Sequence, residues 1–564
     1  MPRWLRRIVD SLLWLVAWVS GRRYDVLARS IGLAPAGEAA VAQRRFILIQ
    51  IDGLAYDFLV QALALGHTPT LQRLIGQGYR LQRWRCGLPS STPAVQAGLL
   101  YGNNWDIPAF RWYEKAEHFA PMCKLPAHVE RIQDRVATGR RGILAGGASY
   151  TNMFDGDARL ALFTISAMGR HSFFEQLRGL GWALLFLLNP WSTLRTITVA
   201  LWELLRDFAR TFARWAAGGF RARLRLIRPF LQVLTNIIFG EIQTFGLRLD
   251  VYRGLPAIYA NFYGYDEVAH GEDPIGPEAL RSLRRIDRHL RAIERMRRIY
   301  WPDTELYVCS DHGMSRATSF AGRNGQALGE LVAAHVQASV LTDQPAAEPD
   351  RASQELSFLL DELDGIESHL SRRGQRLVQA LRRWLLRRAP VEPEAPWDFG
   401  RGDDVIVRSS GSLAHVYFNV TPEAMDVSEI AILYGDLLDA LAHHPDIGLV
   451  LGREGGRAVV VTSHGAGDVT ADRLPSGLAE PEQAAVDLMR LVSFPHSGDL
   501  VLLGAWNTEG RVITFEDQAA AHGGIGGPQE YPFFLTPPGA PLDLSTVVNA
   551  CQLYPYFMER YHRT

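Results

Sequence analysis

The feature that most constrains the fold is a short apolar stretch followed at once by chemistry-bearing residues. Residues 305–309 (ELYVC) are apolar or aromatic except for Glu305 and show no helical spacing, and Asp311, His312 and Gly313 follow them. The pattern predicts a short buried strand. A carboxylate and an imidazole then lie at the carboxyl end of a strand, where open α/β sheets place their ligands. Asp and His both bind zinc-like ions, although a strand-end turn without chemistry explains the pair equally well.

Two further predicted strands end in the same way. Residues 45–51 are almost continuously apolar and lead into Asp52, and residues 258–264 lead into Asp266 and His270. Continuous apolar strands are typical of a parallel sheet covered on both faces. Asp266 and His270 are four residues apart, so one helical turn would place both on one face, able to hold one metal. An amphipathic helix is predicted over 276–299, with its many charges as its solvated face.

A hydroxyl-rich segment precedes another predicted helix. Ser90, Ser91 and Thr92 stand directly before Pro93, which is typical of a helix start. One interpretation is a plain helix cap. The other is that a hydroxyl at a helix amino terminus lies in a positive field that favours an alkoxide and an incoming phosphate.

Composition excludes several classes. The chain has 564 residues, a net charge of −1 and four scattered cysteines, Cys86, Cys123, Cys309 and Cys551. This spacing argues against a disulfide framework or a cysteine zinc site. The near-zero net charge gives no indication of a nucleic-acid partner, and none is expected.

Three segments look unlike the rest. Residues 1–44 contain an apolar run flanked by arginines and too short to span a bilayer, which predicts a helix lying at the membrane surface or packed on the protein itself. Residues 171–254 alternate apolar and arginine-rich stretches, typical of a membrane-surface insertion or a cap over the site. Residues 343–403 predict a basic helical insertion or linker. The core would then comprise 45–170, 255–342 and 404–564.

Together these residues resemble the alkaline phosphatase superfamily, most closely its type I phosphodiesterase/nucleotide pyrophosphatase branch. The resemblance covers roughly 45–165, 255–315 and 405–540. It implies an α/β fold with an alkaline-phosphatase-like central, mostly parallel sheet flanked by helices, here with two helical insertions. It also implies two divalent ions, zinc or manganese, held by three residues each. The first set matches Asp266, His270 and His522, and the second matches Asp52, Asp311 and His312.

The resemblance leaves some positions open. The nucleophile corresponds to Thr92, but Thr92 adjoins Pro93 where the family has an intervening residue, so Ser91 is the alternative. His464 and His496 compete with His522, whose glycine-rich setting (HGGIGGP) matches the family loop better. For contact with the phosphate, Arg111 and Asn104 are the available side chains.

The function that follows is a metal-dependent phosphodiesterase or pyrophosphatase, a hydrolase acting through a covalent phospho-threonine. Its substrate would be a small phosphate ester or a lipid, and the protein would be peripherally membrane-associated. One alternative is a transferase that passes a phospho-alcohol group from a lipid donor to an acceptor. Another is a non-catalytic membrane adaptor that keeps the fold and binds no metal.

Overall fold

The computed structural model of the chain describes residues 44–168, 198, 240–336, 338–342 and 405–562. The predicted amino-terminal membrane segment, most of the predicted insertion at 171–254 and the predicted insertion at 343–403 lie outside the described residues. No helix among the residues that are described is long and apolar enough to cross a bilayer.

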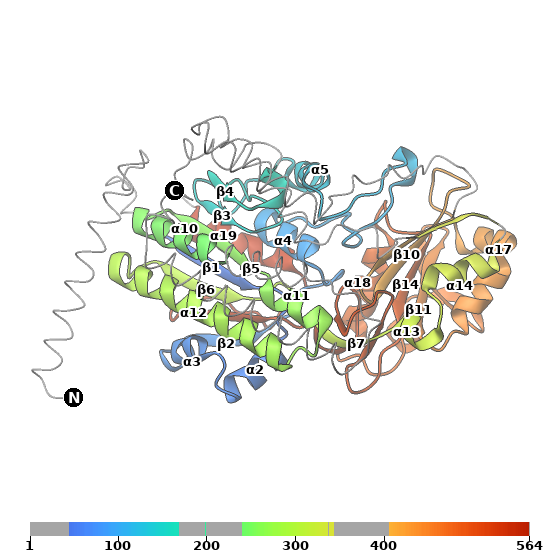
Figure 1. Ribbon diagram of the computed structural model, residues 1–564. Coiled ribbons are helices and arrows are strands. Elements are labelled where there is room, and N and C mark those ends of the chain that lie inside the picture. The colour runs from blue at the N-terminus through green and yellow to red at the C-terminus, as the bar shows by residue number, and fades with distance from the viewer. Residues whose placement is uncertain (1–43, 169–197, 199–239, 337, 343–404, 563–564) are drawn as a thin grey trace, which may run out of the picture.

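A seven-stranded sheet forms the centre of the larger part of the molecule (Figure 1). Its order is β2-β17-β6-β1-β5-β3-β4; the five strands from β6 to β4 run parallel, and β17 is antiparallel to both β6 and β2. The predicted central, mostly parallel sheet is therefore confirmed. The strands are β1 (Phe46–Ile51), β2 (Arg80–Arg83), β3 (Ala148–Tyr150), β4 (Leu160–Leu162), β5 (Ala257–Phe262), β6 (Glu305–Cys309) and β17 (Phe533–Thr536).

Helices cover both faces of this sheet, which is why its central strands are mostly apolar. In β1, Ile47, Ile49 and Ile51 pack into one core and Phe46 and Leu48 into another. The first core is closed by α2 (Tyr56–Ala64), α3 (Pro69–Gly76), α10 (Gly240–Arg253), α11 (Gly264–Gly271) and α12 (Pro277–Tyr300). The second is closed by α4 (Thr92–Tyr101), α5 (Pro126–Ala137) and α19 (Tyr554–Tyr561).

Helix α10 falls inside the segment predicted as an insertion, 171–254. Its residues Phe245, Leu247 and Leu249 are buried in the first core, and the helix packs along α12. This part of the segment therefore packs on one face of the first sheet and does not form a cap.

A second seven-stranded sheet, absent from the sequence-based expectation, forms the other end of the molecule. Its order is β13-β12-β11-β14-β10-β9-β8, and every pairing is antiparallel except β8 with β9. Helices α14 (Leu328–His335) and α17 (Val427–Ala442) cover one face and α18 (Pro481–Val492) the other. The strands are β8 (Val340–Thr342), β9 (Val405–Ser410), β10 (Leu413–Phe418), β11 (Ile447–Glu454), β12 (Arg457–Thr462), β13 (Gly465–Asp468) and β14 (Leu500–Gly504).

A small three-stranded sheet joins the two large ones. It consists of β7 (Ser315–Ser319), β15 (Val512–Thr514) and β16 (Ala520–Ala521), with β7 in the middle. Because β7 follows β6 of the first sheet and β15 follows β14 of the second, the loops of both large sheets meet here.

Candidate metal centre

The predicted metal ligands meet at the carboxyl ends of the central strands. Asp52 directly follows β1, and Asp311 and His312 follow β6. Asp266 and His270 lie on α11, which begins two residues after β5, and His522 directly follows β16. Parallel strands bring their carboxyl ends to one edge of a sheet, so segments more than 200 residues apart in the chain converge.

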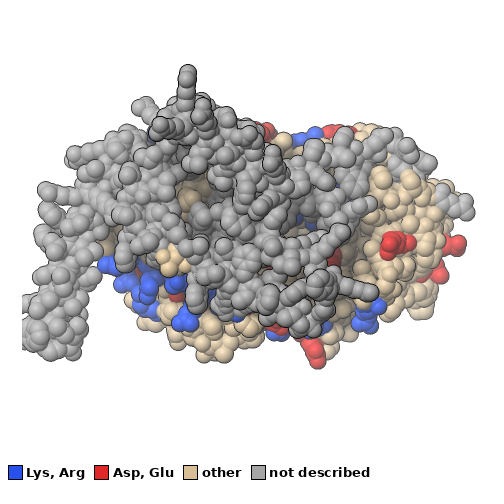
Figure 2. Space-filling view, in the orientation of Figure 1, with Lys and Arg blue, Asp and Glu red and all other residues tan. Residues whose placement is uncertain are grey.

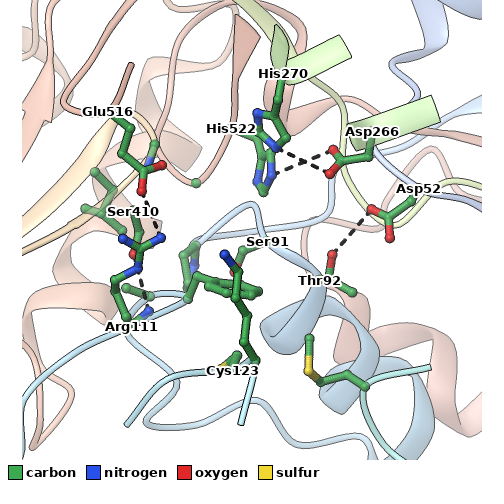
Figure 3. Close-up of a pocket in the computed structure, with 18 of the residues that line it drawn as sticks. Asp52, Ser91, Thr92, Arg111, Cys123, Asp266, His270, Ser410, Glu516 and His522 are labelled. Carbon is green, nitrogen blue, oxygen red and sulfur yellow. Dashed lines mark hydrogen bonds and ion pairs between the residues drawn. The ribbon is translucent and has the colours of Figure 1, made fainter. Parts of the chain in front are cut away.

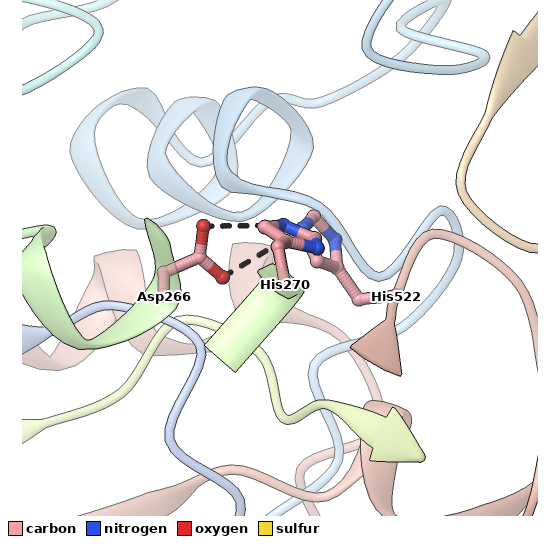
Figure 4. A group of neighbouring side chains, drawn as sticks. All are labelled: Asp266, His270 and His522. Carbon is pink, nitrogen blue, oxygen red and sulfur yellow. Dashed lines mark ion pairs between the residues drawn. The ribbon is translucent and has the colours of Figure 1, made fainter. Parts of the chain in front are cut away.

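The six side chains form two groups of three. In the first, Asp266, His270 and His522 offer ligand atoms that all lie within 4.8 Å of one another, and Asp52, Asp311 and His312 do the same in the second. Figure 4 shows the first group, in which Nε2 of His270 lies 3.3 Å from an Asp266 oxygen. The groups adjoin, because the rings of His312 and His522 stack with centroids 3.8 Å apart. The structure thus assembles both predicted ligand sets.

Each of the three histidines is oriented by its own backbone contact. Nδ1 lies 2.9 Å from the Ala520 carbonyl in His270, 2.8 Å from the Gly313 carbonyl in His312 and 3.0 Å from the Ser90 carbonyl in His522. A carbonyl oxygen only accepts, so each Nδ1 carries the proton and donates it. In the neutral ring Nε2 therefore carries the lone pair and faces the carboxylates, as in histidines that bind metals.

The buried carboxylates fit a cation. Asp266 Oδ1 and Asp311 Oδ2 are buried and have no hydrogen-bond partner among the described residues. Burial, followed by the nearby charge of Asp311, raises the pKa of Asp52 to about 8. Three clustered carboxylates without a cation are costly in a low-dielectric interior. Nitrogen and oxygen donors at this spacing suit zinc, and manganese takes the same ligands.

Protons compete with a cation for part of the site. Burial lowers the pKa of His270, but the adjacent Asp266 carboxylate outweighs it and raises the pKa to about 9. Burial raises the pKa of Asp266, but His270 reverses this and holds it well below the usual range. At neutral pH the first group thus holds a His270–Asp266 ion pair in which the proton occupies the place of a metal.

Gly53 allows the two groups to approach. Its φ is +71°, and a Cβ built on it would lie 2.3 Å from Oδ1 of Asp266. Glycine tolerates this backbone conformation without strain. The turn after β1 is also tied to the turn after β6, because the Leu54 N–H donates to Ser310 Oγ over 2.9 Å.

Thr92 begins helix α4 beside the second group. Its Oγ1 lies 3.4 Å from Oδ1 of Asp52 and 3.2 Å from Nε2 of His312. Ser91, the N-cap residue, makes no side-chain cap hydrogen bond, and its buried Oγ has no partner among the described residues. Both side chains line the same cavity, shown in Figure 3. A hydroxyl that does not cap its helix is available to a molecule in the cavity.

The cavity has a volume of about 330 Å³ and lies between the two large sheets. Asp52, Asp266, His270 and His522 form one end of it. Other parts of the wall come from the segment 109–124, from the second sheet and from the loop after β15; they include Phe110, Arg111, Lys124, Ser410, Leu413 and Glu516. A mixed polar and apolar lining of this size is typical of a small-molecule site.

The two residues predicted to contact phosphate have different positions. Arg111 lines the cavity and forms an ion pair of 2.8 Å with Glu516 (Figure 3). Asn104 does not line it: its side chain accepts from Arg490 over 2.7 Å and donates to Asn549 over 3.2 Å. The structure therefore does not bring Asn104 to the site.

The competing histidines are also separate from the two groups. His464 is exposed in the turn between β12 and β13, where its N–H donates to Thr462 Oγ1. His496 pairs with Asp106 over 2.5 Å. Of the three histidines weighed for this place, His522 is the one found in a ligand group.

Sequence reasoning missed the residues that hold the ligands. Asn261, near the end of β5, donates to Oδ2 of Asp52 over 2.7 Å. Ser90 accepts from the Gly523 N–H and donates to the Gly524 carbonyl, which fixes the loop that carries His522. The signal for Asn261 was a lone amide in a buried apolar strand five residues before Asp266. No local pattern reveals Ser90, because its partners are more than 430 residues away.

Comparisons with known proteins give the following. No protein-family model matches the sequence, and no curated protein matches it. Among solved structures, phosphonoacetate hydrolase from Sinorhizobium meliloti 1021 in complex with phosphonoformate matches with 14% identity and a TM-score of 0.44 over 92% of this chain and 96% of that chain. Murine ectonucleotide pyrophosphatase/phosphodiesterase 5, an inactive variant in complex with AMP, matches with 12% identity and a TM-score of 0.43 over 93% and 96%. The site assignment therefore rests on the geometry of the two ligand groups and of Thr92.

Proposed function

We propose that this chain is a metal-dependent phosphoester hydrolase of the alkaline phosphatase superfamily type, with Thr92 as its nucleophile. One observation carries the proposal: a helix-terminal hydroxyl, the whole first ligand group and Asp52 of the second line a single cavity, and the ligand atoms of Asp311 and His312 lie within 4.8 Å of that of Asp52. The hydroxyl of Thr92 lies within 3.4 Å of a ligand of the second group. This combination suits a hydrolase that transfers a phosphoryl group through a covalent intermediate.

The residues would act as follows. Two divalent ions, when bound by Asp266, His270 and His522 and by Asp52, Asp311 and His312, would supply Lewis acidity and offset the negative charge of a phosphoryl group. Thr92 Oγ1 attacks phosphorus, the bond to the leaving alcohol breaks, and one proton passes from Thr92 to that alcohol. Water then attacks the phospho-threonine, which releases the phosphate product and returns the proton to Thr92.

The amino terminus of α4 favours this chemistry. Helix α4 spans ten residues, so its first turn carries the positive end of a helix dipole. Anions and developing negative charge are stabilised there. We assign Ser91 the role of hydrogen-bond donor to a phosphoryl oxygen, since its hydroxyl lines the cavity and caps nothing.

The rest of the cavity favours an ester with an organic group. Arg111 and Lys124 supply positive charge, and Phe110, Met153 and Ile165 supply apolar surface. A phosphodiester or diphosphate with a small organic substituent would fill it. The lipid substrate and the membrane location expected from the sequence stay predictions, because the segments behind them lie outside the described residues.

The test compares four forms of the full-length protein after loading with zinc or manganese: wild type, Thr92→Ala, Ser91→Ala and Ser319→Ala. Ser319 caps α13 (Phe320–Asn324) by accepting from the Gly322 N–H, and it does not line the cavity, so it is the matched serine control. Hydrolysis of bis-p-nitrophenyl phosphate and p-nitrophenyl phosphate is measured together with metal content.

We expect about two metals per chain in all four forms. Thr92→Ala should lower kcat at least ~10³-fold because the attacking atom is gone. Ser91→Ala should lower it ~10²-fold through loss of one donor, and Ser319→Ala should leave it unchanged. Cleavage of neither ester by metal-loaded wild type would overturn the proposal. Loss of activity in Ser91→Ala with full activity in Thr92→Ala would reverse the two assignments.

A further inference from the structure

The solvent face of helix α12 carries arginine at nearly every exposed position. The exposed arginines are Arg284, Arg288, Arg291, Arg295 and Arg298. Their spacing of four, three, four and three residues keeps them on one side of the helix. At ~1.5 Å per residue the row is ~21 Å long. Figure 2 shows basic side chains gathered on the described surface where α12 runs in Figure 1. We call these five residues the arginine row.

The acidic residues of α12 do not pair with every member of this row. Asp287 is 2% exposed and accepts from the N–H groups of Thr70 and Leu71. Glu294 is 1% exposed and pairs with Arg297 and Arg298. No ion pair joins Arg284, Arg291 or Arg295 to an acid among the described residues. Surface charges of one sign in a row repel one another, so the row is stabilised when an anionic partner lies against it.

The surroundings of the row indicate the kind of partner. A nucleic-acid surface interleaves its cations with aromatic or amide side chains that stack on or read the bases, and the exposed positions between Arg284 and Arg298 offer none. An exposed isoleucine, Ile299, stands at the carboxyl end of the row, with 42% of its surface accessible. Positive charge with an apolar side chain at its edge is the pattern of a surface that contacts anionic lipid.

We infer that the arginine row is a docking surface for an anionic lipid bilayer. Helix α12 packs on the first core with its apolar side, and the arginine row lies on the opposite, solvent-facing side of the helix. It is independent of the proposed hydrolase chemistry, because none of its residues lines the cavity. Each arginine near an anionic membrane surface strengthens binding about fivefold, so the row as a whole strengthens it by about three orders of magnitude.

The test is co-sedimentation of the full-length protein with vesicles of phosphatidylcholine alone or with 30 mol% phosphatidylglycerol added. The test variant is the triple change Arg284→Gln, Arg291→Gln and Arg295→Gln. The matched control is Arg323→Gln, Arg457→Gln and Arg473→Gln, which removes the same charge from exposed positions around the second sheet.

We expect binding to the anionic vesicles that weakens with salt. The test triple should bind ~10²-fold more weakly and the control triple nearly as well as wild type. The thermal unfolding of each protein and its hydrolysis of a soluble ester check that both triples stay folded and active. Equal vesicle binding by wild type and the test triple would overturn the inference, as would an equal loss in the control triple. Binding of the row to duplex DNA but not to vesicles would overturn the assignment to lipid.

Discussion

The two ligand groups of the site are built in different ways. The side chains of Asp52, Asp311 and His312 are at most 3% exposed, and all three follow strands of the first sheet. We call these three residues the buried group. In the other group, which we call the half-exposed group, the exposed fractions are 14% for Asp266, 22% for His270 and 14% for His522. His522 comes from a loop whose backbone is held by the Ser90 hydroxyl on one side and by the turn between β9 and β10 on the other.

The two groups differ in what fixes their ligand atoms. The buried group is fixed by the strands themselves, and its ligand atoms cannot move without the sheet. The half-exposed group depends on both sheets, because Ser412 of the second sheet donates its N–H to the His522 carbonyl. We therefore expect the buried group to bind its metal more tightly and to release it more slowly.

The largest effect should come from the buried group. Asp52→Asn removes the charge beside Thr92 while it keeps the shape of the side chain. We expect loss of one metal per chain and a decrease in kcat/KM of at least ~10³-fold, because both the ligand and the setting of the nucleophile are lost. Asp57→Asn, on the exposed face of α2, is the control. Full metal content and full activity in Asp52→Asn would contradict the assignment.

His522→Ala tests the other group. It should also remove one metal, but the loss of activity, ~10²-fold to ~10³-fold, should be partly reversed by excess zinc because two ligands of an accessible group remain. His464→Ala, which changes an exposed histidine in a turn, should behave as wild type. If excess zinc restores Asp52→Asn as readily as His522→Ala, the two groups do not differ as described.

Gly411→Ala tests the dependence on the second sheet without touching a ligand. Gly411 has a φ of +66°, and a Cβ there would lie 2.1 Å from the His522 carbonyl oxygen. We expect zinc affinity of the half-exposed group to fall ~10-fold to ~100-fold, with the buried group unchanged. Gly455→Ala is the matched control, since its φ is +56° but nothing lies within 4 Å of the added methyl. Zinc affinity is measured by competition with a chromophoric chelator. An equal fall in affinity in both variants would mean that backbone strain, and not the contact with the His522 carbonyl, is the cause.

The smallest effect is on pH dependence. Metal binding must displace the proton held by Asp52, whose pKa is about 8, in one group and by His270, whose pKa is about 9, in the other. Below these values zinc affinity should rise ~10-fold per pH unit for each proton displaced, and the rise should end above them. Zinc affinity measured against pH in His522→Ala reports the buried group. The same measurement in Asp52→Asn reports the half-exposed group. Affinities that do not change between pH 6 and pH 9 would contradict this account.

The sequence predicts the ligands of the buried group more completely than it predicts Asn261 and Ser90, the residues that hold ligands in place. Asp52, Asp311 and His312 stand just after the ends of apolar strands, so local pattern and sheet geometry together place them. His522 needed the resemblance to a family, because its partners are supplied by segments far away in the chain. The second sheet was not predicted because its pairings, such as that of β10 with β14, join segments far apart in the chain. Asn104 was proposed for its side-chain chemistry alone, and its packing against Arg490 and Asn549 could not be read from the chain.

The most direct test of the two-group site is anomalous diffraction at the zinc edge from crystals of the zinc-loaded wild-type protein. The account predicts two peaks, one among Asp266, His270 and His522 and one among Asp52, Asp311 and His312, with the second at higher occupancy after brief exposure to a chelator. A single peak, or peaks away from these residues, would contradict it.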